Sequence, residues 1–330
     1  MAVTLTDVRA NVQDALSAHV IDEFCKSSFL LDNMIFDDVV SPTGGGASPT
    51  YSYVRVTNQA DADSRAINAE YEPQEVKKER VFVDLKVLGG AFEIDRVLAG
   101  MGGVVDEVQF QLQQKIKAVQ ALFSDMVING DSVHNPTGFD GLSKLLAGSG
   151  REVDGAVYGD AFDLSSSEAV DQHYMGFLDA LDEMLAHLDG TPTCLMGNTQ
   201  MIAKLRACAR RCAMYQTTTD TWGNKVECYG NIPLIDLGTK AGTNANIIPN
   251  IENDEGAVVT DLYAVRMGLD GFHGVSINGQ SPIKTFLPDF STPGAVKRGE
   301  VEMVAAVALK SANAAAVMRN VVLWRNPMNN

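Results

Sequence analysis

The chain has 330 residues, which is enough for one large domain or two ordinary ones with a substantial buried core. Hydrophobic residues make up 45% of the sequence and charged residues 21%, and this balance excludes a disordered chain. The formal net charge of −16 predicts a surface that repels nucleic acid and anionic membranes, and it argues against a direct reader of DNA or RNA.

Cysteine usage and the absence of targeting signals favour a reducing compartment. The five cysteines form no dense framework, and their odd number favours reduced thiols. The N-terminus lacks the basic-then-apolar layout of a signal peptide, and no uninterrupted apolar run is long enough to span a bilayer. We therefore expect synthesis and assembly in the cytoplasm, with no membrane partner.

Residues 1–48 have the pattern of an arm more than of a core. Thr6 can cap a short amphipathic helix over 6–20, and a second apolar cluster follows at 29–36 before a Pro- and Gly-rich break. A helix of this size is marginal alone in water, so the arm needs a surface to lie against, on its own domain or on a neighbour. The candidate contact residues of the arm are Phe29, Leu30 and Phe36.

Two strands, Tyr51–Val56 and Val81–Val87, are predicted to frame a long polar excursion. The second strand is expected to place Val81, Val83, Leu85 and Val87 on one face. Such a ribbon is marginal alone, and its charges suggest contact with another subunit, although a solvated hairpin explains the segment more simply in isolation. The candidate charged contact residues are Arg55, Arg65, Glu70, Glu72, Lys77, Lys78 and Arg80.

A long helix is predicted to follow the ribbon. Apolar residues recur at three- and four-residue steps, and neither Gly nor Pro interrupts Val104–Asn129. At about 1.5 Å per residue this rod is roughly 40 Å long. Gly130 is expected to end it in a left-handed conformation. A second helix is expected after Ser165, whose spacing to Glu168 fits a capping box.

The remaining chain mixes helices and strands without a regular βαβ rhythm, and this mixture predicts the α+β class. A third helix is expected over Thr199–Cys212. Further strands are expected over 153–158, 193–196, 225–228, 232–236, 257–267, 274–277, 301–310 and 317–324.

No constellation of residues predicts an active site. The glycine runs at 44–46 and 100–103 lack the spacing and context of a phosphate-binding loop. Cys208 and Cys212 share a helix face and have arginines nearby that could favour thiolates, but two ligands do not make a structural zinc site. Semi-buried packing explains these two cysteines better.

The five histidines and the acidic residues of the second helix are explained without catalysis. No histidine pairs with a Ser or Cys in a nucleophile motif, so solvated or packing roles are expected. Asp179, Asp182 and Glu183 have the spacing of the wet face of an amphipathic helix. We therefore predict no catalytic residue, no cofactor and no metal, which favours a structural or binding role.

The order of elements resembles the Hong Kong 97-like fold of tailed-bacteriophage major capsid proteins. Val104–Gly130 resembles the spine helix of that family, and Asn135–Leu142 is similar to the Pro/Gly-Leu segment that follows it. Cys194–Asn198 with its helix looks like the entry to the axial domain, and Cys228–Ile235 resembles a Gly-x-Pro strand common there. Val301–Lys310 is similar to the closing strand region, so the resemblance covers essentially the whole chain.

The resemblance implies a division into five ranges. They are an N-terminal arm at 1–48, an extended loop at 49–100, a peripheral domain at 101–190 with its spine helix at 104–129, an axial domain at 191–290, and a return through both at 291–330.

The function implied by the resemblance is self-assembly, as pentamers and hexamers, into an icosahedral shell that encloses double-stranded DNA without sequence-specific binding. The short arm implies a separate scaffolding protein rather than a fused one. A portal protein and a possible decoration protein are further implied partners, and the virion is the implied location. Lys77, Lys78 and Asn320 carry no mark of the covalent crosslinking found in some members.

Two other functions remain open at this point. An encapsulin-like nanocompartment shares the fold but holds cargo enzymes. A soluble α+β enzyme with an unrecognised site is the alternative of another class, and it predicts a compact small oligomer that binds a ligand.

Overall fold

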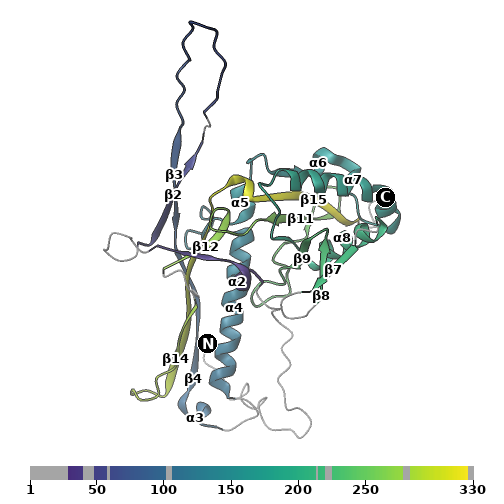
Figure 1. Cartoon of the computed structure of the whole chain (residues 1–330). Coiled ribbons are helices and arrows are strands. Elements are labelled where there is room, and N and C mark those ends of the chain that lie inside the picture. Colours follow the sequence, from purple (N-terminus) through teal and green to yellow (C-terminus); the bar gives the residue numbers. More distant parts are fainter. Residues whose placement is uncertain are drawn as a thin grey trace.

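The computed structural model describes residues 29–39, 48–57, 60–101, 106–212, 215–219, 225–277 and 283–325. The helix predicted over 6–20 lies outside these residues. Within them, helices and sheets are both prominent, which confirms the α+β class. Figure 1 shows a projecting ribbon, an elongated unit built on one long helix, and a compact unit beside it.

The elongated unit combines a five-stranded sheet with the long helix α4 (Glu107–Asn129). Strand β4 (Lys86–Asp95) pairs antiparallel with β14 (Val296–Leu309) along its whole length, and both pack against α4. The other strands of this sheet are β1 (Phe36–Asp38), β12 (Phe272–Ser276) and β13 (Ile283–Phe286). The short helices α2 (Phe29–Asn33) and α3 (Arg96–Ala99) accompany them.

The compact unit is built on an eight-stranded sheet with the order β5-β15-β11-β6-β9-β8-β7, and β10 pairs with β11 off this path. Its strands are β5 (Glu152–Asp154), β6 (Cys194–Gly197), β7 (Tyr215–Thr219), β8 (Lys225–Tyr229), β9 (Ile232–Asp236), β10 (Ile251–Glu252), β11 (Ala257–Val265) and β15 (Ala315–Arg325). Its helices are α6 (Gly155–Tyr158), η1 (Gly159–Phe162), α7 (Ser167–Ala186) and α8 (Thr199–Arg211). Helices α5 (Leu142–Leu146) and η2 (Ala312–Ala314) connect the two units.

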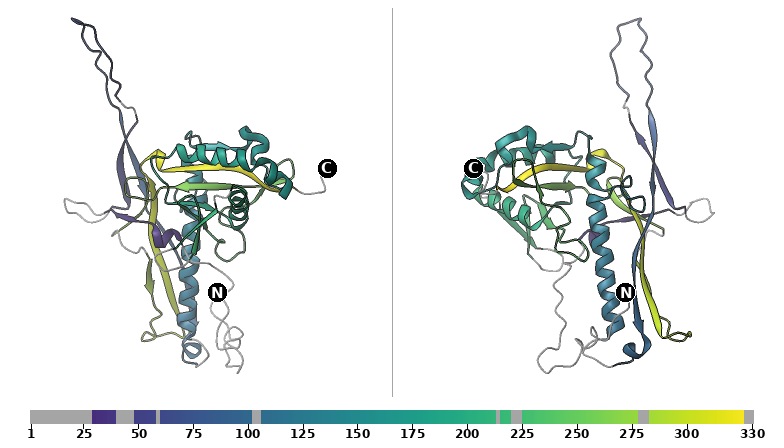
Figure 2. Two further views of the ribbon diagram at one scale, coloured as in Figure 1. Left: turned by 45° about the vertical axis from the view of Figure 1, so that its right-hand side comes forward. Right: turned by 180° about the vertical axis from the view of Figure 1, so that it is seen from behind.

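Side chains alternate across the eight-stranded sheet, so its two faces build two cores. On β11, Tyr263 and Val265 join the core that contains Phe123 of α4, whereas Leu262 and Ala264 join the core that contains α7 and α8. Figure 2 shows α7 covering one face of this sheet. The opposite face packs toward α4 of the elongated unit. The shared sheet therefore ties the compact unit to the long helix.

The long helix is confirmed, with Asp106 as its N-cap and Glu107 as its first residue. The Asp106 carboxylate accepts hydrogen bonds from the backbone N–H groups of Val108 at 2.9 Å and Gln109 at 3.2 Å. At about 1.5 Å per residue its 23 residues form a rod of roughly 35 Å.

The predicted left-handed conformation of Gly130 at the helix end is wrong. Gly130 has φ −59° and ψ 136°, so its backbone is not left-handed. A Cβ at Gly130 would lie 2.3 Å from the carbonyl oxygen of Phe139, which belongs to the segment that folds back against the helix. Close packing of two backbones therefore requires the glycine.

Three other local expectations are corrected. The strand predicted over 153–158 ends at Asp154, because residues 155–158 form the helix α6. The second helix is capped by Ser166 rather than Ser165, and its hydroxyl accepts a hydrogen bond from the N–H of Ala169 at 3.0 Å. Val87 is 65% exposed and Leu88 is 3% exposed, so the alternation predicted through Val87 stops at Leu85. The chain changes partner there, because β3 (Lys78–Asp84) belongs to the ribbon while β4 pairs with β14.

Candidate intersubunit contact site

The ribbon is an antiparallel pair of β2 (Thr50–Val56) and β3, in register from Thr50 opposite Asp84 to Val56 opposite Lys78. Beyond the pair, residues 60–77 form neither strand nor helix and extend away from both units (Figures 1 and 2). Ile67 is 91% exposed. A two-stranded ribbon is marginal alone in water, and this one projects beyond the cores of its own chain.

Few contacts order the described part of the tip. The guanidinium of Arg65 donates to the carbonyl oxygen of Ala69 at 3.0 Å and lies 5.3 Å from the centre of the Tyr71 ring. The N–H of Asp61 donates to Oε1 of Gln74 at 2.8 Å. The candidate residues Glu70, Glu72, Lys77 and Lys78 are all exposed here. These charges are therefore available to another molecule.

The outward face of the ribbon carries apolar side chains that the sequence interpretation did not single out. Val54 is 62% exposed and Phe82 is 63% exposed, on the face that they share with Arg80. The Arg80 guanidinium donates to the Ser52 hydroxyl at 2.9 Å and lies 5.5 Å from the centre of the Phe82 ring. Apolar side chains next to an arginine are typical of protein–protein contacts.

The inward face of the ribbon is anchored to the elongated unit. The Tyr53 hydroxyl donates to the carbonyl oxygen of Leu309 at 2.8 Å. The guanidinium of Arg55 donates to the same oxygen at 2.5 Å and to the carbonyl oxygen of Lys310 at 3.2 Å. Arg55 therefore lies at the base of the ribbon, bound to its own chain, and apart from the exposed charges of the tip.

The three candidate residues of the arm lie against the core of their own chain. Leu30 is 0% exposed, and Phe29 is partly buried around the same cluster. The centres of the Phe36 and Phe123 rings are 6.1 Å apart. Phe36 also packs closely on Gly274, where an added Cβ would lie 2.5 Å from its ring. These residues fix the point where the arm enters the molecule.

A further exposed apolar loop lies at the far end of the elongated unit, between β13 and β14. Leu287 is 63% exposed and Phe290 is 42% exposed. The ammonium of Lys297, which is 7% exposed, holds this loop through the carbonyl oxygens of Thr292 at 2.6 Å and Pro293 at 3.0 Å. The sequence signal was an isolated phenylalanine in a Pro-bounded turn, which the sequence interpretation passed over.

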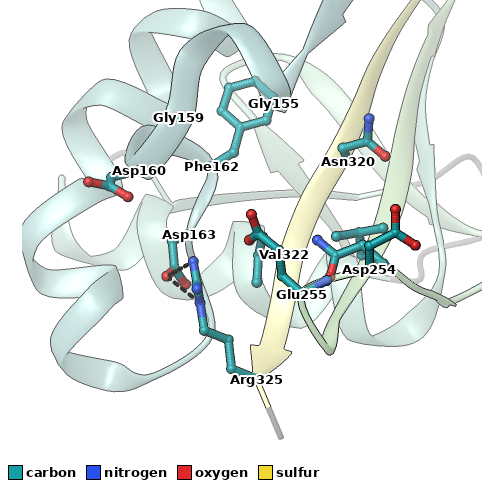
Figure 3. A pocket seen from close by; sticks show the side chains of 12 residues that line it. Gly155, Gly159, Asp160, Phe162, Asp163, Asp254, Glu255, Asn320, Val322 and Arg325 are labelled. Atoms are coloured by element: carbon teal, nitrogen blue, oxygen red, sulfur yellow. Dashed lines mark hydrogen bonds and ion pairs between the residues drawn. The ribbon is translucent and has the colours of Figure 1, made fainter. Parts of the chain in front are cut away.

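A cleft of about 480 Å³ lies beside the end of β15, and Figure 3 shows the side chains that line it. Its carboxylates come from Asp160, Asp163, Asp254 and Glu255, and Asp163 forms an ion pair with Arg325 at 3.0 Å. Among the described residues, no group of three or more histidine, cysteine or acidic side chains could hold a metal ion.

The cysteines of the described chain have the environment of packing residues. Cys194, Cys208 and Cys228 are buried, and Cys212 is half-buried. Burial raises the pKa of the Cys208 thiol to about 12 and outweighs the charge of Arg211 beside it. The suggestion that nearby arginines favour thiolates is therefore wrong for Cys208.

No helix in the described part of the chain is long and apolar enough to cross a membrane.

Comparisons with known proteins agree with this architecture through structure rather than sequence. Neither the scan of protein-family models nor the search of curated proteins found a match. Among solved structures, the SrpI encapsulin of Synechococcus elongatus matches with a TM-score of 0.65 and 16% identity, over 99% of both chains. The capsid of the native GTA particle matches with a TM-score of 0.61 and 13% identity, over 94% of this chain and 96% of that one.

The capsid of Myoviridae phage XM1 is also similar, with a TM-score of 0.58 and 11% identity over 92% of this chain and 96% of that one. Each of the three matches covers more than nine tenths of both chains, so the similarity extends over the elongated unit and the compact unit. The chain therefore has the Hong Kong 97-like fold, the fold of these two capsids and of the encapsulin.

Proposed function

We propose that the chain is the major capsid protein of a tailed bacteriophage. Many copies would assemble as pentamers and hexamers into an icosahedral shell around double-stranded DNA, within the virion. The observation that carries this proposal is the agreement in fold with phage capsids over nearly the whole of both chains. The work assigned to the chain is mechanical containment without turnover.

The exposed ribbon supports this role because it presents apolar side chains beside Arg80 and lies beyond the cores of its own chain. We propose that its tip and outward face lie across a neighbouring subunit, where Arg65, Glu70, Glu72, Lys77, Lys78 and Arg80 would make contacts. Rings of identical subunits use heterologous contacts, in which one surface meets a different surface of the next copy. An exchanged ribbon would bury a large area per contact, as an obligate assembly requires.

The division into five ranges is kept as part of the proposal, but the border between the peripheral and axial domains is moved. The pairing of β14 with β4, followed by the entry of β15 into the eight-stranded sheet, supports a return through both units over 291–330. Helix α7 packs on the eight-stranded sheet, which argues for placing the border of the axial domain ahead of Ser167.

The proposal also includes partners that a closed phage head needs. They are a separate scaffolding protein, a portal protein and a possible decoration protein, with assembly in the host cytoplasm. The net charge of −16 is compatible with a container whose wall does not bind its DNA.

An encapsulin-like compartment is the second candidate, and the similarity to the SrpI encapsulin favours it specifically. The contents of the particle distinguish the two. Particles would be purified from the cells that produce them naturally and examined by negative-stain microscopy, nuclease protection and protein mass spectrometry. We expect spherical shells that protect DNA. Shells that contain another protein and no DNA would favour the encapsulin, and the absence of shells would contradict both.

A further inference from the structure

The base of the ribbon contains a fully buried histidine whose ring nitrogens are both unpaired. His273 on β12 is 0% exposed, and neither Nδ1 nor Nε2 has a hydrogen-bond partner among the described residues. Nearly all buried polar side chains are hydrogen-bonded, and an unpaired one destabilises the folded state. A histidine kept in such a site therefore calls for an explanation beyond packing.

The surroundings of His273 connect it to the ribbon through a single carboxylate oxygen. Oδ2 of Asp37 accepts a hydrogen bond from the Tyr51 hydroxyl at 2.6 Å and lies 3.4 Å from the ammonium of Lys310. Nε2 of His273 is 4.0 Å from the same oxygen. The rings of Tyr51 and His273 meet edge to face with centres 5.9 Å apart. Tyr51 belongs to β2, so this oxygen ties the ribbon to β1.

The charged and titratable groups around His273 come from four segments. Strand β1 supplies Asp37 with Asp38 beside it, β2 supplies Tyr51, the turn before β12 supplies Asp270, and the end of β14 leads to Lys310. Burial lowers the pKa of His273 and Lys310 lowers it further, while Asp37, the backbone of Gly271 and Asp270 oppose this effect. The imidazole is therefore neutral at neutral pH.

In the closed arrangement Asp37 is ionised and Tyr51 is protonated. Burial opposes ionisation of Asp37, but the Tyr51 hydrogen bond and the charge of Lys310 outweigh it and leave the pKa of Asp37 below its ordinary value. Burial and Asp37 raise the pKa of Tyr51, so its hydroxyl keeps its proton. The closed arrangement thus consists of a neutral histidine, an ionised aspartate and a tyrosine that donates to it.

We propose that His273 is an acid-sensitive latch on the ribbon, in which the imidazolium takes the Asp37 carboxylate from Tyr51 and loosens the start of β2. One proton from solvent binds the imidazole, which gains a positive charge in a site already next to Lys310. The new charge attracts the oxygen 4.0 Å away and repels the ammonium that helps to hold it. Both changes weaken the hydrogen bond from Tyr51.

The direction of the pH effect follows from linkage. The closed latch lowers the pKa of His273 below the ordinary value of 6.5, so protons favour the open state. The closed latch is fully stable above that pH, and its stability falls as the pH drops below it. The latch is a property of one chain and does not depend on shell formation.

Hydrogen–deuterium exchange of the full chain tests the latch. Peptides that cover residues 50–57 would be followed from about pH 7.5 to about pH 5, with rates corrected for the intrinsic pH dependence of exchange. We expect corrected exchange to rise several-fold in acid in the wild type and to stay flat in His273→Gln. Tyr51→Phe should exchange fast at both pH values, because it lacks the hydroxyl.

His134→Gln is the matched control, since the His134 side chain is 87% exposed and pairs with Asp131 rather than with a residue of the ribbon. This control should keep the wild-type response. The same acid response in His273→Gln as in the wild type, or a flat wild-type profile, would overturn the latch. If His273→Gln fails to fold, the wild-type midpoint decides, because a midpoint above about 6.5 contradicts a lowered histidine pKa. The presence or absence of particles at neutral pH separately reports on the shell proposal.

Discussion

Buried polar side chains hold together segments that are distant in the sequence. Asn198 is 1% exposed, and its Oδ1 accepts from the N–H of Met201 at 2.8 Å to cap α8. Its amide nitrogen lies 3.2 Å from the carbonyl oxygen of Ile248 and 2.8 Å from the Thr260 hydroxyl. Asn198 therefore joins the start of a helix to two other parts of the compact unit.

Substitution of Asn198 tests this joint. Asn198→Ala removes a helix cap and leaves buried acceptors unpaired, so we expect the free energy of unfolding to fall by about 2–4 kcal/mol. Asn198→Asp keeps the cap but places a carboxylate oxygen next to the carbonyl oxygen of Ile248. The loss of stability in this variant should become smaller in acid, where the carboxylate is protonated. Denaturant unfolding measures both, with the exposed Asn244→Ala as control. A loss in Asn198→Ala no larger than in this control would contradict the assigned role.

The sequence carries only part of this residue's role. An asparagine directly before an amphipathic run is a legible helix cap. Its bonds to Ile248 and Thr260 depend on tertiary folding and leave no local signal. The same holds for Arg319, whose guanidinium joins Glu152 at 2.5 Å and Asp261 at 3.1 Å.

The tip of the ribbon is expected to serve contacts between chains and not the folding of its own chain. Its base is bound through Tyr53 and Arg55, whereas its described tip contacts little except itself. Removal of the tip should therefore leave the two cores intact and affect only association between chains.

Replacement of residues 58–76 by Asn-Gly tests that separation. The N–H of Thr57 donates to the carbonyl oxygen of Lys77 at 3.0 Å, so a two-residue turn can close the ribbon there. We expect unfolding free energy within about 0.5 kcal/mol of the wild type, because the change is on the surface, but failed or fragile shells. In the control variant, a Gly-Ser segment of the same length replaces residues 58–76, so that the chain is not shortened. Normally stable shells from the Asn-Gly variant would refute the role given to the tip.

The elements that the sequence predicted well have strong local patterns. Strand β9 has the predicted bounds, and the apolar spacing of α4 identified it to within a few residues. Among the strands that were missed, β1 and β13 are three and four residues long and exist through their pairing with β12 and β14. The switch of faces at Leu85 was missed because it depends on which strand becomes the partner of β4.

For the whole molecule, order along the chain was more informative than any motif. An apolar arm, a charged ribbon and a long helix followed by a mixed domain indicated the fold, although each signal is weak by itself. The comparisons agree at identities of 11–16%, which shows that sequences with little similarity form the same arrangement of elements. The surfaces that join copies could not be read in this way, because a contact with another chain leaves no periodic pattern.

The mass of the assembled protein tests the shell proposal most directly. The purified chain, alone and co-expressed with its proposed scaffolding protein, would be measured by multi-angle light scattering over a range of concentrations. The account predicts particles of many subunits, together with rings of five or six when assembly is incomplete. A monomer or dimer under every condition would contradict it.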